Sequence, residues 1–285
     1  MSELDKVNDK SKKYDIVKID TDKHKIPQRK CALNNVLPRY PFSMQLSGPS
    51  GSGKTNLLIN IMTNACMYKD YFHYILVFSP TAGELDDTYK SLKLPKENFI
   101  KNISSEVLKK IIEQRKEQIK KQGIEKVSKT SRMLIILDDV IANKKFLNSD
   151  DALVLFTLLR HYLISVIILV QSYNAVPKKM RNSCNAVAVF PSKRSEVEVL
   201  KEEITPAGLS KKDFEKVINY CNKGEHSFLF INNHAPKDEK IRCNLNEILT
   251  LDKMKQILNT NNIKPIEYKE DTDDNEKDEL PDESK

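Results

Sequence analysis

The chain has 285 residues, which is enough for one large α/β domain with appendages. Its composition, 39% hydrophobic and 31% charged, is typical of a soluble globular protein, and no apolar run reaches the roughly 18 residues of a membrane span. The amino-terminal segment is rich in Lys and Asp and does not resemble a secretory signal. Five cysteines, an odd number without a CxxC pair, predict reduced thiols in an intracellular compartment.

Charge is spread unevenly along the chain, whose net charge is +7. Residues Glu267 to Lys285 contain ten Asp or Glu and three Lys, whereas the preceding residues contain 44 Lys or Arg and 30 Asp or Glu. A basic body with an acidic tail favours a polyanionic partner for which the tail competes. A solvated surface with a solubilising tail is the alternative, and charge alone does not separate the two.

The first half of the chain predicts strands and helices in turn. Residues 1–30 lack periodicity and predict a flexible arm. The apolar runs and their spacing then predict a strand over Phe42–Leu46, a helix over Asn56–Met62, a strand over Tyr74–Phe78, a helix over Asn102–Gln122 and a strand over Met133–Leu137.

The second half continues the alternation and ends in a hairpin. The expected elements are a helix over Asp150–Tyr162, strands over Ser165–Val170 and Ala186–Phe190, helices over Ser192–Ile204 and Ser210–Cys221, and a hairpin of Ser227–Ile231 with Lys240–Cys243. Strands that alternate with helices predict an α/β fold with a mostly parallel central sheet flanked by helices. We expect one domain over residues 31–250, then a helix-like segment and acidic tail over 251–285, disordered after 266.

Residues Gly48 to Thr55 match the P-loop pattern, between an apolar strand and a helix. Backbone N–H groups of such a loop cradle phosphate oxygens, so the segment predicts binding of ATP. Lys54 is expected to reach the β- and γ-phosphates, and the Thr55 hydroxyl to ligate Mg²⁺. A glycine-rich turn that binds nothing is the alternative. The nucleotide-binding residues predicted here are Gly48, Pro49, Ser50, Gly51, Ser52, Gly53, Lys54, Thr55 and Asn56.

Two acids and a glutamine follow later strands. Asp138 and Asp139 end a five-residue apolar run, where Asp138 is expected to hold Mg²⁺ and Asp139 to orient or deprotonate the attacking water. Their roles are open to exchange. Gln171 ends the next strand, where its amide is expected to contact the γ-phosphate or the water; an ordinary polar strand end is the alternative.

Two arginines flank that strand. Arg160 precedes it and Arg181 follows Gln171 by ten residues. Either is a candidate arginine finger, which stabilises charge on the transferred phosphoryl group, and in a ring it would act on the neighbouring subunit's nucleotide. A surface or interface salt bridge is the alternative for each.

The stretch from Arg160 to Asn182 resembles the FtsK–HerA superfamily of DNA-pumping ATPases, and more narrowly the poxvirus-type packaging ATPases of large DNA viruses, virophages and polinton-like elements. It shares an Arg before the fourth core strand, a Gln at its end and a Pro followed by Arg-Asn. The basic–acidic segment Lys193–Glu203 is also similar, and the resemblance covers Pro41 to Ile231. Asp139 stands where cellular members usually have Glu, and the viral branch tolerates Asp there.

This resemblance implies a RecA-like P-loop core, a hexameric or related homo-oligomeric ring, and ATP-driven movement of double-stranded DNA into a preformed capsid. It further implies a capsid or portal protein as partner and a place in the host cytoplasm, at the virus factory, or in the virion. It favours Arg160 over Arg181 as the finger.

A DNA pump needs basic contacts that do not read sequence. One candidate surface is the predicted long helix with its continuation, although a solvated helix face is the alternative; its residues are Lys109, Lys110, Arg115, Lys116, Lys120, Lys121, Lys126 and Lys129. The other consists of Lys178, Lys179 and Arg181.

Other function classes remain as alternatives. A small-molecule phosphotransferase, such as a nucleoside kinase, needs an acceptor pocket and leaves Gln171 without a role. A GTPase switch lacks its Asn-Lys-x-Asp string here. Another P-loop nucleic-acid ATPase, such as a processive helicase, shares the core, but no separate set of helicase motifs is recognised here. The set Cys221, His226, His234 and Cys243 fits no standard zinc spacing, so a zinc site is not expected.

Overall fold

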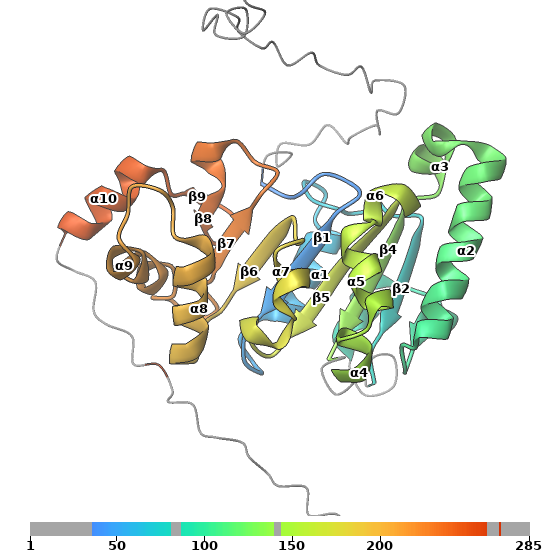
Figure 1. Cartoon of the computed structure of the whole chain (residues 1–285), viewed down its shortest axis with the longest axis horizontal. Helices are drawn as coiled ribbons and strands as arrows, with labels where there is room; N and C mark the ends of the chain where they lie inside the picture. The colour runs from blue at the N-terminus through green and yellow to red at the C-terminus, as the bar shows by residue number, and fades with distance from the viewer. Residues whose placement is uncertain (1–35, 81–86, 140–143, 261–267, 269–285) are drawn as a thin grey trace, which may run out of the picture.

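The computed structural model describes residues 36–80, 87–139, 144–260 and 268. Across these residues runs one sheet with the strand order β3-β2-β4-β5-β1-β6-β7-β8-β9 (Figure 1). Six neighbouring strands are parallel: β1 (Ser43–Ser47), β2 (Tyr74–Phe78), β3 (Phe99–Ile100), β4 (Met133–Asp138), β5 (Ile164–Val170) and β6 (Ala186–Val189). The remaining three extend the sheet in antiparallel pairing: β7 (Leu229–Asn232), β8 (Ile241–Cys243) and β9 (Glu247–Ile248).

Helices cover both faces of the sheet. One face carries α1 (Lys54–Thr63), the 3₁₀ segment η3 (Asp87–Leu92) and α3 (Ile124–Thr130). The long helix α2 (Ser105–Gln122) lies along the β2 side of the molecule (Figure 1). The other face carries α4 (Lys144–Leu147), α5 (Asp150–Thr157), α6 (Leu159–Tyr162), α7 (Lys178–Arg181), α8 (Arg194–Ile204), α9 (Lys211–Cys221) and α10 (Leu251–Asn259).

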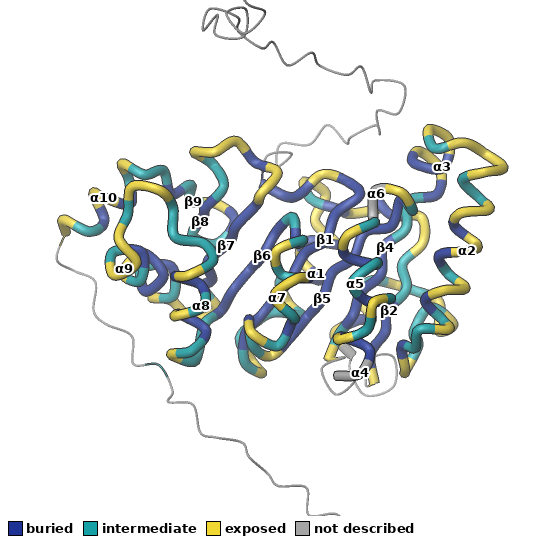
Figure 2. The backbone as a smooth tube through the Cα atoms, viewed as in Figure 1, coloured by how far each residue is buried: buried dark blue, intermediate teal, exposed yellow. Residues whose placement is uncertain are grey.

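The sheet separates two hydrophobic cores. Along β5, Val166 and Ile168 belong to the core under α5 and α8, whereas Ile167 and Leu169 belong to the core under α1. This period of two is what a strand produces when both of its faces are covered. All seven residues of β5 are buried, and Figure 2 shows the same burial along the neighbouring central strands.

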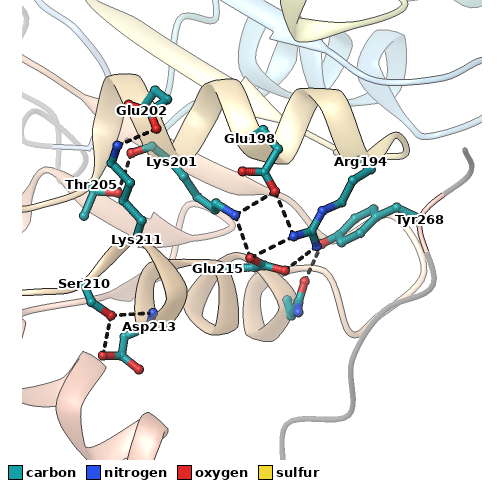
Figure 3. A network of polar contacts seen from close by, with 11 residues as sticks. Arg194, Glu198, Lys201, Glu202, Thr205, Ser210, Lys211, Asp213, Glu215 and Tyr268 are labelled. Atoms are coloured by element: carbon teal, nitrogen blue, oxygen red, sulfur yellow. Dashed lines mark hydrogen bonds and ion pairs between the residues drawn. The ribbon is translucent and has the colours of Figure 1, made fainter. Parts of the chain in front are cut away.

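A network of ion pairs joins α8 to α9 (Figure 3). The Lys201 Nζ donates to a carboxylate oxygen of Glu198 at 2.8 Å and to one of Glu215 at 2.7 Å, and Arg194 also pairs with Glu215. The Tyr268 hydroxyl donates to the side-chain carbonyl of Asn219 on α9. Charges in this region are therefore satisfied within the chain.

The predicted α/β fold, the mostly parallel sheet and the closing hairpin are confirmed. The Ser210 hydroxyl caps α9 by accepting from the Asp213 N–H at 3.0 Å. The single helix predicted over Asp150–Tyr162 is wrong: Leu158, with φ −105° and ψ 16°, leaves helical geometry and separates α5 from α6.

The sequence analysis did not predict the shortest elements, namely the two-residue strands β3 and β9, the short helices α3, α4 and α7, and the 3₁₀ segments. Helix α10 lies within the region expected to contain a helix-like segment. The flexible arm over 1–30 and the acidic tail after Tyr268 fall outside the described residues. In the part of the chain that is described, no helix is both long and apolar enough to cross a membrane.

Candidate nucleotide-binding site

Three neighbouring strands end at one edge of the sheet and bring the predicted motifs together. β5 lies between β1 and β4, with Ser47 opposite Val170 and Asp138 opposite Leu169. The loop after β1, the glutamine after β5 and the acids of β4 therefore leave the sheet side by side. In open α/β sheets this carboxyl edge is where ligands bind.

The loop after β1 is built for an anion. Gly51 and Gly53 have φ angles of +77° and +101°, which favour glycine. The N-cap of α1 is Gly53, which has no side chain that could accept from the first N–H groups of the helix. The buried Ser52 hydroxyl has no hydrogen-bond partner among the described residues. Unfilled donors around a glycine-rich turn fit phosphate oxygens.

Lys54 starts α1 and points back over the loop, since its Nζ donates to the Pro49 carbonyl oxygen at 2.8 Å. Burial lowers the pKa of Lys54, and the negative charges of Asp138 and Asp139 oppose that shift. The ammonium therefore stands close enough to both acids to feel their charge. The two carboxylates and the hydroxyl of the half-buried Thr55 are hard oxygen ligands that fit Mg²⁺, and the ammonium of Lys54 beside them fits the phosphates of a triphosphate.

The two acids have different surroundings. Asp138 is half-buried at the end of β4, and its Oδ2 accepts a hydrogen bond of 2.6 Å from the Tyr89 hydroxyl. Asp139 is exposed and has a φ of +52°, a left-handed conformation that Asp tolerates better than most residues. β4 ends at Asp138, and Asp139 lies in a bend directly after the strand.

Gln171 lies where the sequence predicts, directly after β5. Its Nε2 is 3.5 Å from the Asp139 Oδ1, and both side chains are exposed at the carboxyl edge. This is a long contact that leaves room for both groups to reorient. The amide and the carboxylate are thus neighbours at the edge of the sheet that also carries the phosphate loop.

The two candidate fingers lie in different environments. Arg160 belongs to α6, which leads into the amino end of β5; its side chain falls outside the described residues. Arg181 is buried inside its own chain, where it donates to Glu203 from Nε at 3.2 Å and from Nη2 at 2.7 Å, and to the Val176 carbonyl oxygen from Nη1 at 2.6 Å. Its side chain is only 8% exposed. This arrangement argues against Arg181 as a finger or as a DNA contact.

The basic residues of α2 also divide into different classes. Arg115 is 2% exposed and donates to the carbonyl oxygens of Tyr162 at 3.0 Å and Leu163 at 2.9 Å, so its assignment to a DNA surface is wrong. Sequence missed this because the acceptors lie 47 and 48 residues away. The other predicted contacts of this helix and its continuation are exposed, with Lys109, Lys121 and Lys129 in ion pairs. Lys178 and Lys179 are exposed on α7.

Two side chains at the site were not predicted. One is Tyr89, and the other is His226, whose Nδ1 lies 3.2 Å from the carbonyl oxygen of Ser52 in the phosphate loop. His226 has a φ of +61° in the segment between α9 and β7. Neither belongs to a recognisable motif, and 49 and 174 residues separate them from their partners.

The fold resembles solved nucleotide-hydrolysing proteins. The DNA-packaging ATPase B204 of Sulfolobus turreted icosahedral virus matches 68% of this chain and 93% of its own, with a TM-score of 0.48 and 14% identity. The B204 genome packaging NTPase of Sulfolobus turreted icosahedral virus 2, in complex with ATP-gammaS, matches 70% of this chain and 95% of its own, with the same TM-score and identity. The cytoplasmic domain of the type VII secretion ATPase EccC from Thermomonospora curvata matches 74% of this chain and 24% of its own (TM-score 0.43, 12% identity).

Sequence comparison gives a closer relationship. The DNA packaging protein OPG160 of Variola virus is 29% identical over 195 residues, which cover 67% of this chain and 68% of that protein. The family model of the poxvirus A32 protein matches residues 30–261, an interval that contains the phosphate loop, both acids, Gln171 and both candidate arginines. The chain therefore belongs to the poxvirus A32 protein family.

Proposed function

We propose that this chain is an ATP-hydrolysing motor that moves double-stranded DNA and packages a viral genome into a preformed capsid. The observation that carries the proposal is the convergence of Lys54, Asp138 with Asp139, and Gln171 at three adjacent strand ends. A protein that only binds phosphate needs a cation such as Lys54. Hydrolysis also needs groups that act on water, such as Asp139 and Gln171. The printed name of the Variola virus relative, a DNA packaging protein, supports the choice of DNA as the moved polymer.

The residues divide into those that hold ATP and those that act on water. Backbone N–H groups within the loop from Gly48 to Thr55 and the Lys54 ammonium would hold the phosphates, while the Thr55 hydroxyl and the Asp138 carboxylate would hold Mg²⁺. When bound, Mg²⁺ neutralises charge that develops on the phosphate oxygens. Asp139 accepts the proton of the attacking water, and the Gln171 amide orients that water. The exposure of Asp139 and its contact with Gln171 support this division, with Asp138 as the metal ligand.

Arg160 is the proposed finger, and its place in the fold favours action between subunits. α6 enters the amino end of β5, whereas the phosphate loop lies at the carboxyl edge of the same sheet. Seven strand residues at about 3.3 Å each separate the two edges by roughly 23 Å. An arginine side chain does not span that length. We therefore propose that Arg160 acts on the nucleotide of a neighbouring subunit in a homo-oligomeric ring.

Exposed lysines are the proposed contacts with DNA. We propose Lys178 and Lys179, because α7 follows Gln171 closely and would couple the hydrolytic site to the polymer. A capsid or portal protein is the proposed partner at the virion, and the host cytoplasm, at the virus factory, is the proposed place of action.

The test of the function is ATP hydrolysis by the purified chain with and without duplex DNA. Hydrolysis that rises with duplex DNA and disappears in Lys54→Ala supports the motor. Phosphate transfer to a nucleoside with no effect of DNA contradicts it and favours the phosphotransferase alternative.

The inter-subunit finger has a separate test. Arg160→Ala and Asp139→Ala are each expected to abolish hydrolysis alone. In a mixed ring, some interfaces join an Arg160→Ala subunit to an Asp139→Ala subunit. At a fraction of these interfaces the first subunit supplies an intact Asp139 and the second an intact Arg160, so the site is complete. Partial recovery of hydrolysis on mixing is expected; no recovery, with assembly of both variants verified, contradicts action between subunits.

A further inference from the structure

A buried tyrosine lies against the acid at the end of β4. Tyr89 belongs to η3, between β2 and β3, and its side chain is 1% exposed. Its hydroxyl donates to the Asp138 Oδ2 at 2.6 Å. Its ring meets that of Phe99 edge-on, with centroids 6.2 Å apart and planes at 80°. The phenol thus has a fixed place beside the proposed Mg²⁺ ligand.

We propose that Tyr89 is a positioning residue that fixes the orientation of the Asp138 carboxylate for the Mg²⁺ that accompanies ATP. The inference rests on the proposed nucleotide site. Tyr89 itself touches neither phosphate nor metal in this assignment. It acts through Asp138.

The chemistry of the contact supports a positioning role. The terminal torsion of an aspartate is broad, so a carboxylate without a directional partner rotates over a wide range. A hydroxyl that donates to a carboxylate at 2.6 Å makes a short, charge-assisted hydrogen bond, which selects one orientation. Groups that ligate metals are commonly held by such outer partners, and removing the partner typically costs roughly 10- to 100-fold in metal affinity.

Packing keeps Tyr89 in place. It belongs to the same hydrophobic core as Leu58 and Ile61 of α1, the helix that starts at the phosphate loop. η3 as a whole packs against α1. The segment that holds the phenol therefore packs on the helix that presents Lys54 and Thr55, and this contact connects the two halves of the nucleotide site.

Other buried tyrosines of this core show what an ordinary partner looks like. The Tyr40 hydroxyl donates to the Leu163 carbonyl oxygen and the Tyr68 hydroxyl to that of Pro38. Backbone carbonyls of this kind satisfy a buried phenol. Tyr89 instead donates to the side chain of the strand-end acid, which a purely structural tyrosine does not require.

The experiment measures nucleotide affinity rather than turnover. A fluorescent, slowly hydrolysed ATP analogue is titrated into the full chain in EDTA and again at increasing Mg²⁺, for the wild type, Tyr89→Phe and Tyr68→Phe. Tyr68→Phe is the matched control, because it removes a buried hydroxyl from the same core beside Phe42, at the other end of β1. Both variants keep the ring, and both are also compared in thermal unfolding.

A positioning role predicts a specific pattern. Tyr89→Phe binds the ATP analogue in EDTA as tightly as the wild type does. It requires about 10-fold or more Mg²⁺ than the wild type for the same gain in affinity. Tyr68→Phe matches the wild type in both titrations, even where its thermal midpoint falls. Mg²⁺ dependence of Tyr89→Phe equal to that of the wild type overturns the proposal. If Tyr89→Phe does not fold, Tyr89→Met, which keeps apolar volume without the hydroxyl, is judged by the same outcomes.

A double-mutant cycle shows whether the effect passes through Asp138. In an Asp138→Asn background, Tyr89→Phe is expected to add no further change in Mg²⁺ dependence, since the group it positions is no longer charged. Full additivity of the two changes contradicts the assignment. A wild type that binds no analogue under any condition defeats the proposed function itself, which separates that failure from failure of the role of Tyr89.

Discussion

Lys54 at the carboxyl edge of the sheet and Lys201 on the face covered by α8 and α9 each have two acidic neighbours. The pKa values of these two lysines nevertheless shift in opposite directions. At Lys201 burial works against the charge, but hydrogen bonds to Glu198 and Glu215 outweigh it and the pKa is raised. At Lys54 burial prevails over the charges of Asp138 and Asp139, and the pKa is lowered. Lys201 bonds directly to both carboxylates, whereas Lys54 bonds to the Pro49 carbonyl oxygen.

The charges around Lys201 stabilise the fold, whereas under the proposed function the charges around Lys54 bind a ligand. Between α8 and α9, Arg194, Lys201 and Lys211 each pair with a carboxylate, as Figure 3 shows. At the carboxyl edge the Lys54 ammonium donates to a backbone carbonyl oxygen, and the Asp138 carboxylate accepts from a tyrosine hydroxyl. Under the proposed function an anion and a divalent cation bind between these groups. The following changes test this contrast, from the largest expected effect to the smallest.

Lys54→Ala removes the cation of the phosphate loop. Hydrolysis of ATP is expected to fall by roughly 100- to 1,000-fold or more, because charge on the transferred phosphate loses a preorganised partner. The thermal midpoint is expected to stay near that of the wild type. Lys201→Ala is the matched control: it lowers the midpoint while hydrolysis per folded molecule persists, and the reverse pattern would remove the contrast between the two regions.

Arg181→Ala breaks a buried ion pair and leaves Glu203 without its cation. We expect a loss of about 3–5 kcal/mol of unfolding free energy, measured by urea denaturation. Burial raises the pKa of Glu203, but Arg181 and Tyr173 outweigh burial and hold it below its usual value. A depressed pKa means that this stability is present above the unfolded value of about 4.5 and is lost as pH falls through the folded one.

The double variant Arg181→Met with Glu203→Leu removes both charges at once. It is expected to recover much of the stability, since no uncompensated charge remains buried. Hydrolysis in this folded double variant is expected to persist. Its complete loss would restore Arg181 as a catalytic candidate.

Arg115→Ala is expected to destabilise the chain by about 1–3 kcal/mol, because buried carbonyl oxygens at the end of α6 lose their donor. Lys116→Ala is the control, because Lys116 is the next residue of the same helix and is exposed. This change is expected to affect stability little. Equal effects in thermal or urea unfolding would contradict the buried role of Arg115.

Lys178→Ala and Lys179→Ala are expected to give the smallest effect. Each should reduce the slope of log affinity for duplex DNA against log salt by about one unit, independent of DNA sequence, with stability unchanged. A double substitution that leaves the slope intact would move the DNA contact elsewhere, with Lys110 and Lys120 of α2 as the next surface to substitute.

Local patterns were enough to predict most of the strands, the phosphate loop and the strand-end acids. Each of these rests on a continuous run of residues, such as the apolar run before Asp138 or the eight residues from Gly48 to Thr55. The alternation of strands and helices then predicts a parallel sheet, although the order of its strands depends on pairings between distant segments.

What the sequence did not reveal depends on partners far along the chain. Arg115 and Arg181 look like surface cations until the carbonyl of Leu163 and the carboxylate of Glu203 lie beside them. Tyr89 lies on a short 3₁₀ segment with no periodic pattern, and its meaning comes from the contact with Asp138. Two paired residues are likewise too few to signal a strand such as β3.

Two glycines of the phosphate loop, Gly48 and Gly51, disfavour other residues for different structural reasons. A Cβ at Gly51 would meet nothing within 4 Å, so only its positive φ restricts it, and Asn is the replacement with the best prospect of acceptance. A Cβ at Gly48 would lie 2.6 Å from the Cβ of Phe190 at the end of β6, so every side chain there displaces the sheet, with or without nucleotide. Invariance at Gly48 would thus record the architecture of the domain, whereas the substitutions accepted at Gly51 would record the demands of the loop backbone.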